Sequence, residues 1–182
     1  MPIYIAMLRA VNLGQHNRMQ MAKLRDSLEA LGFTQVQTYI QSGNVVFSAG
    51  KTSPLTLTKK IEAKILTDFG LSVSAITTTS GEMNAVIQHN PFISQRGVDP
   101  ARLHVTFLSE RPGDPALRML TPRQSGADKF HCSGKNIYLY CPNGYGQTKL
   151  TNSLFERALS VRATTRNWKT VNKLYEMALA CR

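Results

Sequence analysis

The chain has 182 residues, of which 42% are hydrophobic, and a formal net charge of +11. This apolar content excludes a globally disordered chain, and the length suits one large domain or two small ones. No apolar run approaches the roughly 18 residues of a membrane-spanning helix, and the N-terminus lacks the basic segment and long apolar run of a secretion signal. The composition therefore predicts a globular cytoplasmic protein.

The cysteines and histidines do not predict a metal site. Cys132, Cys141 and Cys181 are an odd number without zinc-like spacing, which favours reduced structural thiols. His104 and His131 lie on predicted strands, also without the spacing of metal ligands. We therefore predict no metal and no cofactor.

The positive charge is unevenly distributed along the chain. Residues 1–91 contain 8 Lys and Arg against 5 Asp and Glu, whereas residues 92–182 contain 14 against 6. The second half therefore attracts anions more strongly, which indicates nucleic acid or a phosphorylated ligand as a partner. A solvated basic surface without a dedicated partner explains the same charge, because net charge bears on association and not on fold.

The first half is predicted to form a strand, a helix, two strands, a helix and a strand, over residues 3–8, 21–31, 36–40, 45–48, 54–69 and 73–78. The run Ile3–Leu8 is apolar at nearly every position, which is typical of a central strand buried on both faces. Ser42-Gly43 between two β-rich runs predicts a tight hairpin. Ser53 followed by Pro54 predicts the start of a helix.

The two halves are predicted to be joined by a short helix and a connector. Residues 79–82 form the capping-box pattern Thr-Ser-Gly-Glu, which introduces a helix through Ile87. Asn90-Pro91 ends this helix, and turn residues are frequent over 92–102. We therefore predict domains over 1–91 and 103–182, with 92–102 as the connector.

The second half repeats this order, with strands over 103–108, 129–132, 136–141 and 161–165, and helices over 114–120 and 148–160. Thr170 is predicted to cap a last helix. The order strand–helix–strand–strand–helix–strand predicts an α+β chain of two ferredoxin-like (βαββαβ) repeats. Strands that are apolar on both faces need a second cover, so we expect the two sheets to pack against each other, although a dimer partner would serve equally.

The predicted topology gathers Thr148 and Lys149 with Arg166, Asn167 and Trp168. A glycine-bearing loop entering a helix offers N–H groups to phosphate, Lys149 and Arg166 add full charges, and Trp168 offers a stacking surface for a base. In a purely structural alternative, Trp168 fills the edge of the core. Arg166 and Asn167 then cap strand ends, and Thr148 caps a helix.

A second candidate site lies where the loop after the first strand meets the turn between the second and third strands. There Arg9 and Asn12 approach Asn44, and these residues are predicted to hold an anion. In the alternative, Asn12 and Asn44 satisfy local turn hydrogen bonds, a role that suits Asn.

No catalytic set is evident in the sequence. Neither a Ser-His-Asp pattern nor a pair of carboxylates stands out among the 11 Asp and Glu. Gly50-Lys51-Thr52 imitates the end of a phosphate-binding loop but lacks the earlier glycine. We therefore predict no catalytic residues.

Five segments, in order, carry a resemblance: LRAVNLG (8–14), TYIQSGNVVF (38–47), NPF (90–92), TKLT (148–151) and ATTRNW (163–168). Together they resemble an uncharacterised bacterial family, domain of unknown function family 1697. Members usually have Gly at the position of Ala10, and often a second Gly at that of Gln15, so the first loop departs from the family pattern. The resemblance implies a compact cytoplasmic αβ protein and brings no established activity.

Our leading hypothesis is a protein that binds nucleic acid or another phosphate-bearing anion through the basic surface of the second half. One alternative is an enzyme acting on a small phosphorylated or nucleotide-like metabolite, with the same cations as electrostatic clamps. Another is a protein-interaction module whose basic face meets an acidic partner. Both a monomer and a homodimer fit the sequence.

Overall fold

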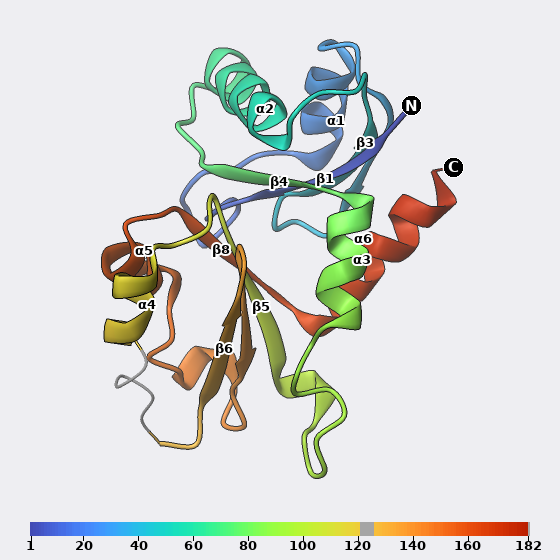
Figure 1. The fold of residues 1–182 in the computed structure, drawn as a ribbon. Coiled ribbons are helices and arrows are strands. Elements are labelled where there is room, and N and C mark those ends of the chain that lie inside the picture. Colours follow the sequence, from blue (N-terminus) through green and yellow to red (C-terminus); the bar gives the residue numbers. More distant parts are fainter. Residues whose placement is uncertain (121–125, 182) are drawn as a thin grey trace. The chain divides into compact units, whose positions relative to one another are not determined.

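The computed structural model describes residues 1–120 and 126–181 (Figure 1). The first half contains β1 (Ile3–Leu8), α1 (Met21–Glu29), β2 (Thr34–Tyr39), β3 (Asn44–Ser48), α2 (Pro54–Phe69) and β4 (Ala75–Thr79), followed by α3 (Ser80–Gln88). The second half contains the short helix η1 (Pro100–Arg102), β5 (Leu103–Leu108), α4 (Asp114–Leu120), β6 (Lys129–Ser133), β7 (Asn136–Tyr140), the short helix η3 (Tyr145–Gln147), α5 (Asn152–Leu159), β8 (Ala163–Asn167) and α6 (Trp168–Ala180).

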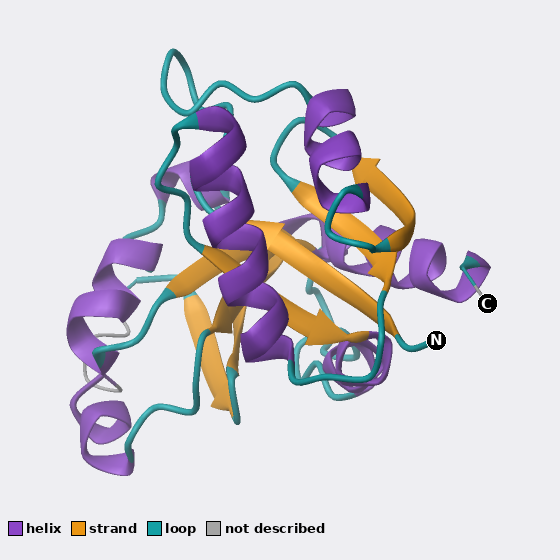
Figure 2. Cartoon of the chain, turned by 90° about the horizontal axis from the view of Figure 1, so that it is seen from above, coloured by secondary structure: helices purple, strands orange, loops and turns teal. Residues whose placement is uncertain are grey.

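These strands form two four-stranded sheets in which every pair is antiparallel. The strand orders are β2-β3-β1-β4 and β6-β7-β5-β8, so each half places its first and third strands in the centre. Figure 2 shows the strands in orange and the helices in purple. This is the ferredoxin-like order, and the predicted α+β fold of two such repeats is confirmed. No helix among the described residues is long and apolar enough to cross a membrane.

The contacts of the chain divide it into two units. The first unit is Met1–Ala85 with Lys173–Arg182, and the second is Val86–Asn172. The predicted connector 92–102 lies within the second unit. Helices α3 and α6 both cross the division. Directly after α6, Cys181 Sγ accepts a hydrogen bond at 3.4 Å from Gln37 Nε2 of β2.

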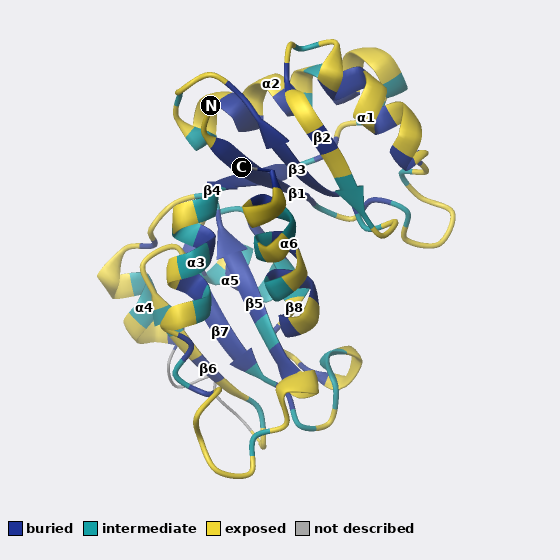
Figure 3. Ribbon diagram, turned by 90° about the vertical axis from the view of Figure 1, so that its right-hand side faces the viewer, coloured by how far each residue is buried: buried dark blue, intermediate teal, exposed yellow. Residues whose placement is uncertain are grey.

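In each unit, the central strands are the most buried elements (Figure 3). In the first unit, helices α1 and α2 cover the sheet face that carries Tyr4, Ala6 and Leu8 of β1. Phe33 and Phe47 stack in this core with ring centroids 4.5 Å apart. Burial of these apolar side chains is the main force that holds the helices to the sheet.

The second unit has an equivalent core under α4 and α5. Ile137 and Leu139 of β7 are fully buried there with Leu120 of α4 and Phe155 of α5. Phe130 packs edge-on against Phe155, with ring centroids 6.1 Å apart. The helices over this face of each sheet therefore come from its own βαββαβ repeat.

Two helix starts follow their predicted signals. Ser53 Oγ accepts a hydrogen bond from Thr56 N at 3.1 Å, and Pro54 is the first residue of α2. At α3, Glu82 Oε2 accepts from Thr79 N at 2.8 Å, while Glu82 N donates to Thr79 Oγ1 at 3.1 Å. This reciprocal pair is the predicted capping box.

Two other helix starts were predicted wrongly. Helix α5 begins at Asn152 after the cap Thr151, whose Oγ1 accepts from Leu154 N, and not near Thr148. Helix α6 begins at Trp168, because Asn167 Oδ1 accepts from Thr170 N at 2.8 Å and so takes the cap position predicted for Thr170. Strand β8 accordingly extends to Asn167, two residues beyond its predicted end.

Candidate functional site

Of the residues predicted to hold a ligand in the second unit, Asn167 and Trp168 have structural roles. Asn167 caps α6 with its side chain oxygen. Only 9% of the surface of Trp168 is exposed to solvent, so its ring offers no open face on which a base could stack. Trp168 therefore behaves as in the structural alternative, whereas Asn167 caps the start of a helix and not the strand end expected there.

Arg166 lies on β8, opposite Val105 of β5. Its Nη1 donates to Thr164 Oγ1 at 3.0 Å and to Thr165 O at 2.9 Å, which fixes the guanidinium against its own strand. Burial lowers the pKa of Arg166 to about 10, and the nearby Tyr145 opposes this shift. Arg166 is thus a half-buried, locally bonded cation and not a projecting one.

Thr148 is buried and holds the loop between β7 and α5. Its hydroxyl donates to Asp128 Oδ2 at 2.6 Å and accepts from Leu150 N at 3.1 Å. The contact ties this loop to the segment before β6. It also places a carboxylate next to the predicted anion site, which opposes the binding of anions there.

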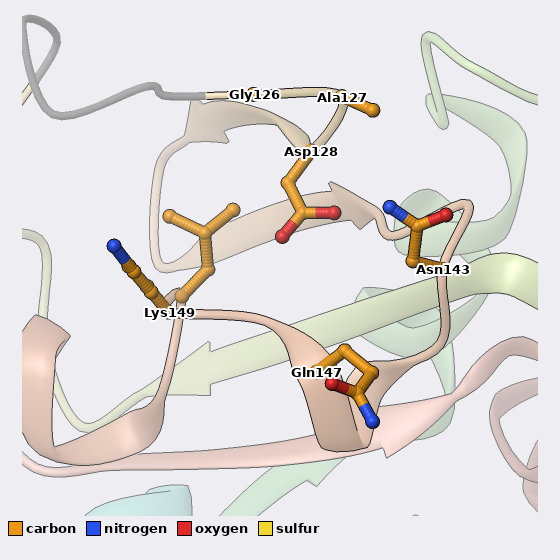
Figure 4. A pocket seen from close by; sticks show the side chains of 7 residues that line it. Gly126, Ala127, Asp128, Asn143, Gln147 and Lys149 are labelled. Carbon is orange, nitrogen blue, oxygen red and sulfur yellow. The ribbon is translucent and has the colours of Figure 1, made fainter.

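Lys149 lines a pocket of 350 Å³ next to this contact (Figure 4). The other lining residues are Gly126, Ala127, Asp128, Asn143, Gln147 and Leu150. Arg166 is not among the lining residues, so this pocket does not join Lys149 and Arg166 in one cradle. A lining with one lysine, one carboxylate and two carboxamides suits mixed polar groups better than a phosphate alone.

Exposed cations do gather at this end of the second sheet. Lys129 begins β6, Arg102 directly precedes β5, and Lys169 lies in the first turn of α6 after β8. Lys149 follows η3, and a side chain at Gly144 would come within 3.1 Å of Arg102 Nη1, so Arg102 lies against the same loop. We call these four exposed residues the cationic sheet end.

Sequence reasoning missed Arg102 and Lys129 as members of this group. Register explains their proximity: Tyr140 of β7 pairs with both Lys129 and Leu103, and His104 pairs with Asn167. Neighbouring strands lie about 4.8 Å apart, so residues bordering the same row are close together. The signal in the sequence was a cation at the border of three of the four strands.

His104 lies between this end and the core of the second unit. Its ring stacks on Tyr145 with centroids 4.8 Å apart, and Nδ1 has no hydrogen-bond partner in the described part of the chain. Burial lowers the pKa of His104, with the Arg102 backbone opposing the shift. The neutral ring is therefore the favoured form near pH 7.

In the first unit, Asn12 joins three segments. Its Nδ2 donates to Met19 O at 2.9 Å and to Gln41 O at 2.8 Å, and its Oδ1 accepts from Met19 N at 2.7 Å. Asn44 is fully buried and donates to Tyr39 O and Ser42 Oγ within its own hairpin. Asn44 therefore has the local turn role that was the alternative prediction.

Asn12 also lines a hollow of 610 Å³ next to the start of α1. The remaining lining residues are Gly14, Arg18, Met19, Gln20, Lys23, Gln41 and Phe69. We call this cavity the N-terminal hollow. Arg9 and Asn44 are not among its lining residues, so only Asn12 of the three predicted residues belongs to it.

The fold defines the class of this protein, which is an α+β chain of two ferredoxin-like units with basic loop surfaces. Within that class, the chain belongs to the family described as Protein of unknown function (DUF1697), whose model matches residues 1–138. No curated protein matches the chain. The matched region includes the N-terminal hollow and ends before Lys149.

A solved structure extends the likeness to nearly the whole chain. It is that of the conserved bacterial protein SP0830 from Streptococcus pneumoniae, with 25% sequence identity and a TM-score of 0.75. The match covers 97% of this chain and 98% of that one. The comparison supports the fold and carries no activity.

Proposed function

We propose that this chain is a cytoplasmic protein that binds nucleic acid through the cationic sheet end. The observation that carries the proposal is that four exposed cations, Arg102, Lys129, Lys149 and Lys169, border the same end of one sheet. Within residues 1–120 and 126–181, none of them forms an ion pair. Their charge is therefore available to a partner.

The acids at this end are few and already engaged. Asp99 Oδ1 accepts from Ala101 N at the start of η1, and Asp128 accepts from Thr148. These bonds hold both carboxylates to the protein, and the balance of four cations against two acids stays positive. Such a surface raises the local concentration of polyanions and speeds their association.

The spread of the cations favours a polymer over a small anion. These cations come from the borders of three strands and from the loop after η3. Lys149 is the one of the four that lines the 350 Å³ pocket. A single phosphate cannot contact cations spread over several strands, whereas successive phosphates of a nucleic-acid backbone can. The groups available contact the backbone and not the bases, so we expect little sequence preference.

Fluorescence anisotropy with mixed-sequence DNA and RNA oligonucleotides tests the proposal. We expect nonspecific dissociation constants of about 10⁻⁴–10⁻⁶ M at physiological salt, and a log–log salt slope near −3 for single strands if all four cations contact phosphate. The double variant Lys149→Gln/Lys169→Gln should reduce the size of this slope by about 1.5.

Lys59→Gln/Lys60→Gln is the matched control, because it removes the same charge from exposed positions on α2 in the first unit. It should leave the salt slope within about 0.5 of the parent value. If both double variants reduced the salt slope equally, nucleic-acid binding would depend on net charge alone and not on the cationic sheet end. Absence of uptake at low salt would refute the proposed function outright.

A further inference from the structure

A second surface with its own chemistry lies in the first unit, at the N-terminal hollow. We propose that this hollow binds a small phosphate ester that carries a ring, with nucleoside monophosphates as the ligand class. The proposal does not depend on the cationic sheet end, which belongs to residues of the other unit. The volume of 610 Å³ lies within the range of small-molecule sites.

The charge of the hollow favours a phosphate group. Arg18 and Lys23 are its two ionised lining residues, and the lining contains neither Asp nor Glu. Both side chains are exposed, and neither forms an ion pair in the described part of the chain. Two cations that line one cavity without an acidic lining residue are a charge arrangement that an anion completes.

The start of α1 adds to this charge. Gln20 caps the helix without a side-chain hydrogen bond, and the first turn has no acidic residue. The first N–H groups of α1 therefore keep their donors for a ligand, and they point from the positive end of the helix dipole. This effect supplements Arg18 and Lys23, which line the same cavity.

The acidic residue closest in the sequence to a lining residue of the hollow is Asp68, and it is hydrogen-bonded to residues outside the lining. Asp68 directly precedes Phe69 but accepts hydrogen bonds from Ser27 and Lys64. The bond from Ser27, followed by that from Lys64, lowers the pKa of Asp68. Its carboxylate is thus ionised, paired and directed to neighbours outside the lining of the hollow.

The wall of the hollow is held in a defined shape. Asn12 bridges Met19 and Gln41 with three hydrogen bonds, so the loop after β1 cannot move independently of the β2–β3 turn. Ala10 and Asn12 have φ of 54° and 55°, a left-handed conformation that few residues adopt. Such a conformation persists only where neighbouring contacts fix it, and it keeps the site preorganised.

Phe69 and two carboxamides suit the rest of a nucleotide. Phe69 lies at the end of α2 and is half-buried, so part of its ring is open to the hollow. Gln20 and Gln41 offer donors and acceptors of the kind that bind the edge of a base. An inorganic phosphate would use only the cations, whereas a nucleoside monophosphate would use both parts of the lining.

Isothermal titration calorimetry on the full chain tests this, with four nucleoside monophosphates, the matching nucleosides and inorganic phosphate as probes. We expect at least one monophosphate to bind at least tenfold more tightly than its nucleoside and than inorganic phosphate. The double variant Arg18→Gln/Lys23→Gln should weaken the binding of monophosphates at least tenfold. Phe69→Leu should weaken the binding of monophosphates severalfold and leave the affinity for inorganic phosphate unchanged.

Three controls keep the outcomes distinct. Lys59→Gln/Lys60→Gln and Lys149→Gln/Lys169→Gln should not change monophosphate affinity, and a loss in the second variant would transfer the site to the cationic sheet end and overturn the proposal. Because Phe69 also packs against the core, Gln41→Ala, an exposed position, serves as the second lining variant. Nucleosides that bind as tightly as monophosphates, or no binding by any probe up to millimolar concentration, would also overturn the proposal.

Discussion

Replacing Asn12 by Ala should destabilise the first unit, because this side chain holds three segments together. The two hydrogen bonds to Met19 are partly buried and the one to Gln41 is exposed. Each partly buried bond contributes about 1 kcal/mol to stability and the exposed one about 0.5 kcal/mol, so losing all three costs about 2.5 kcal/mol. The φ of 55° adds about 1 kcal/mol, because Ala tolerates this region less well than Asn. We expect a total of about 3.5 kcal/mol.

Two matched variants separate these contributions. Asn12→Gly loses the same hydrogen bonds but adopts positive φ freely, so it should recover about 1 kcal/mol relative to Asn12→Ala. Asn17 has φ of 47° in the same loop, but among the described residues its side chain makes one hydrogen bond, to Ala10 O at 3.1 Å. Asn17→Ala should therefore cost about half as much as Asn12→Ala.

Urea unfolding followed by far-UV circular dichroism measures the free-energy changes, provided that the slopes with denaturant agree among the variants. Hydrogen–deuterium exchange gives a local readout, and Asn12→Ala should speed exchange in residues 9–20 and 40–44. A cost below 1 kcal/mol for Asn12→Ala, or equal costs for Asn12→Ala and Asn17→Ala, would refute the reasoning that Asn12 fixes the wall of the hollow.

Three further predictions concern strain and buried titratable groups. Ile40 is β-branched and 51% exposed but has φ of 51°, so Ile40→Gly should raise stability by about 1 kcal/mol in urea unfolding; a loss would show that its side chain packs. Burial lowers the pKa of His104, so the unfolded state binds more protons, and the urea midpoint should fall as the pH drops below about 6.5. His104→Phe should flatten this dependence, and an unchanged profile would assign it to other groups. Burial raises the pKa of Cys132 to about 11, so at pH 8 a disulfide reagent should react with it far more slowly in the native protein than in urea. A fast native reaction would mean that the thiol is accessible and ionised.

The fold was predictable because its signals are local. The cap at Ser53, the capping box at residues 79–82 and the apolar run Ile3–Leu8 each depend on neighbours within a few residues, and all appear in the structure. The start of α5 was not predictable in this way. Thr148 and Thr151 are both plausible caps, and the choice depends on Asp128, which takes the hydroxyl of Thr148 from 20 residues away.

The candidate sites depended on longer-range information. The sequence placed Asn12 near the β2–β3 turn, because the topology brings these loops together. It did not predict that Phe69, at the far end of α2, completes the same cavity with Arg18 and Lys23. The exposure of individual side chains could not be predicted from the sequence either. Trp168 and Arg166 have suitable chemistry for a ligand, but packing holds the first and local hydrogen bonds hold the second.

The two repeats differ chiefly in which loop is long. In the first unit, the connection from the first strand to the first helix covers residues 9–20, and that from the third strand to the second helix covers only 49–53. In the second unit the lengths are reversed: the corresponding connections cover 109–113 and 141–151. Loops placed by a rigid scaffold carry binding residues more often than the scaffold does.

This reversal accounts for the two different sites. Arg18 and the bridge made by Asn12 lie in the long connection of the first unit, whereas Lys149 lies in the long connection of the second. Equivalent positions of the two repeats therefore carry different chemistry, and a ligand site in one repeat cannot be transferred to the other by analogy. Because the sites share no residue, substitutions at Arg18 and Lys149 should have additive effects on stability, and each should change the binding of one ligand class only.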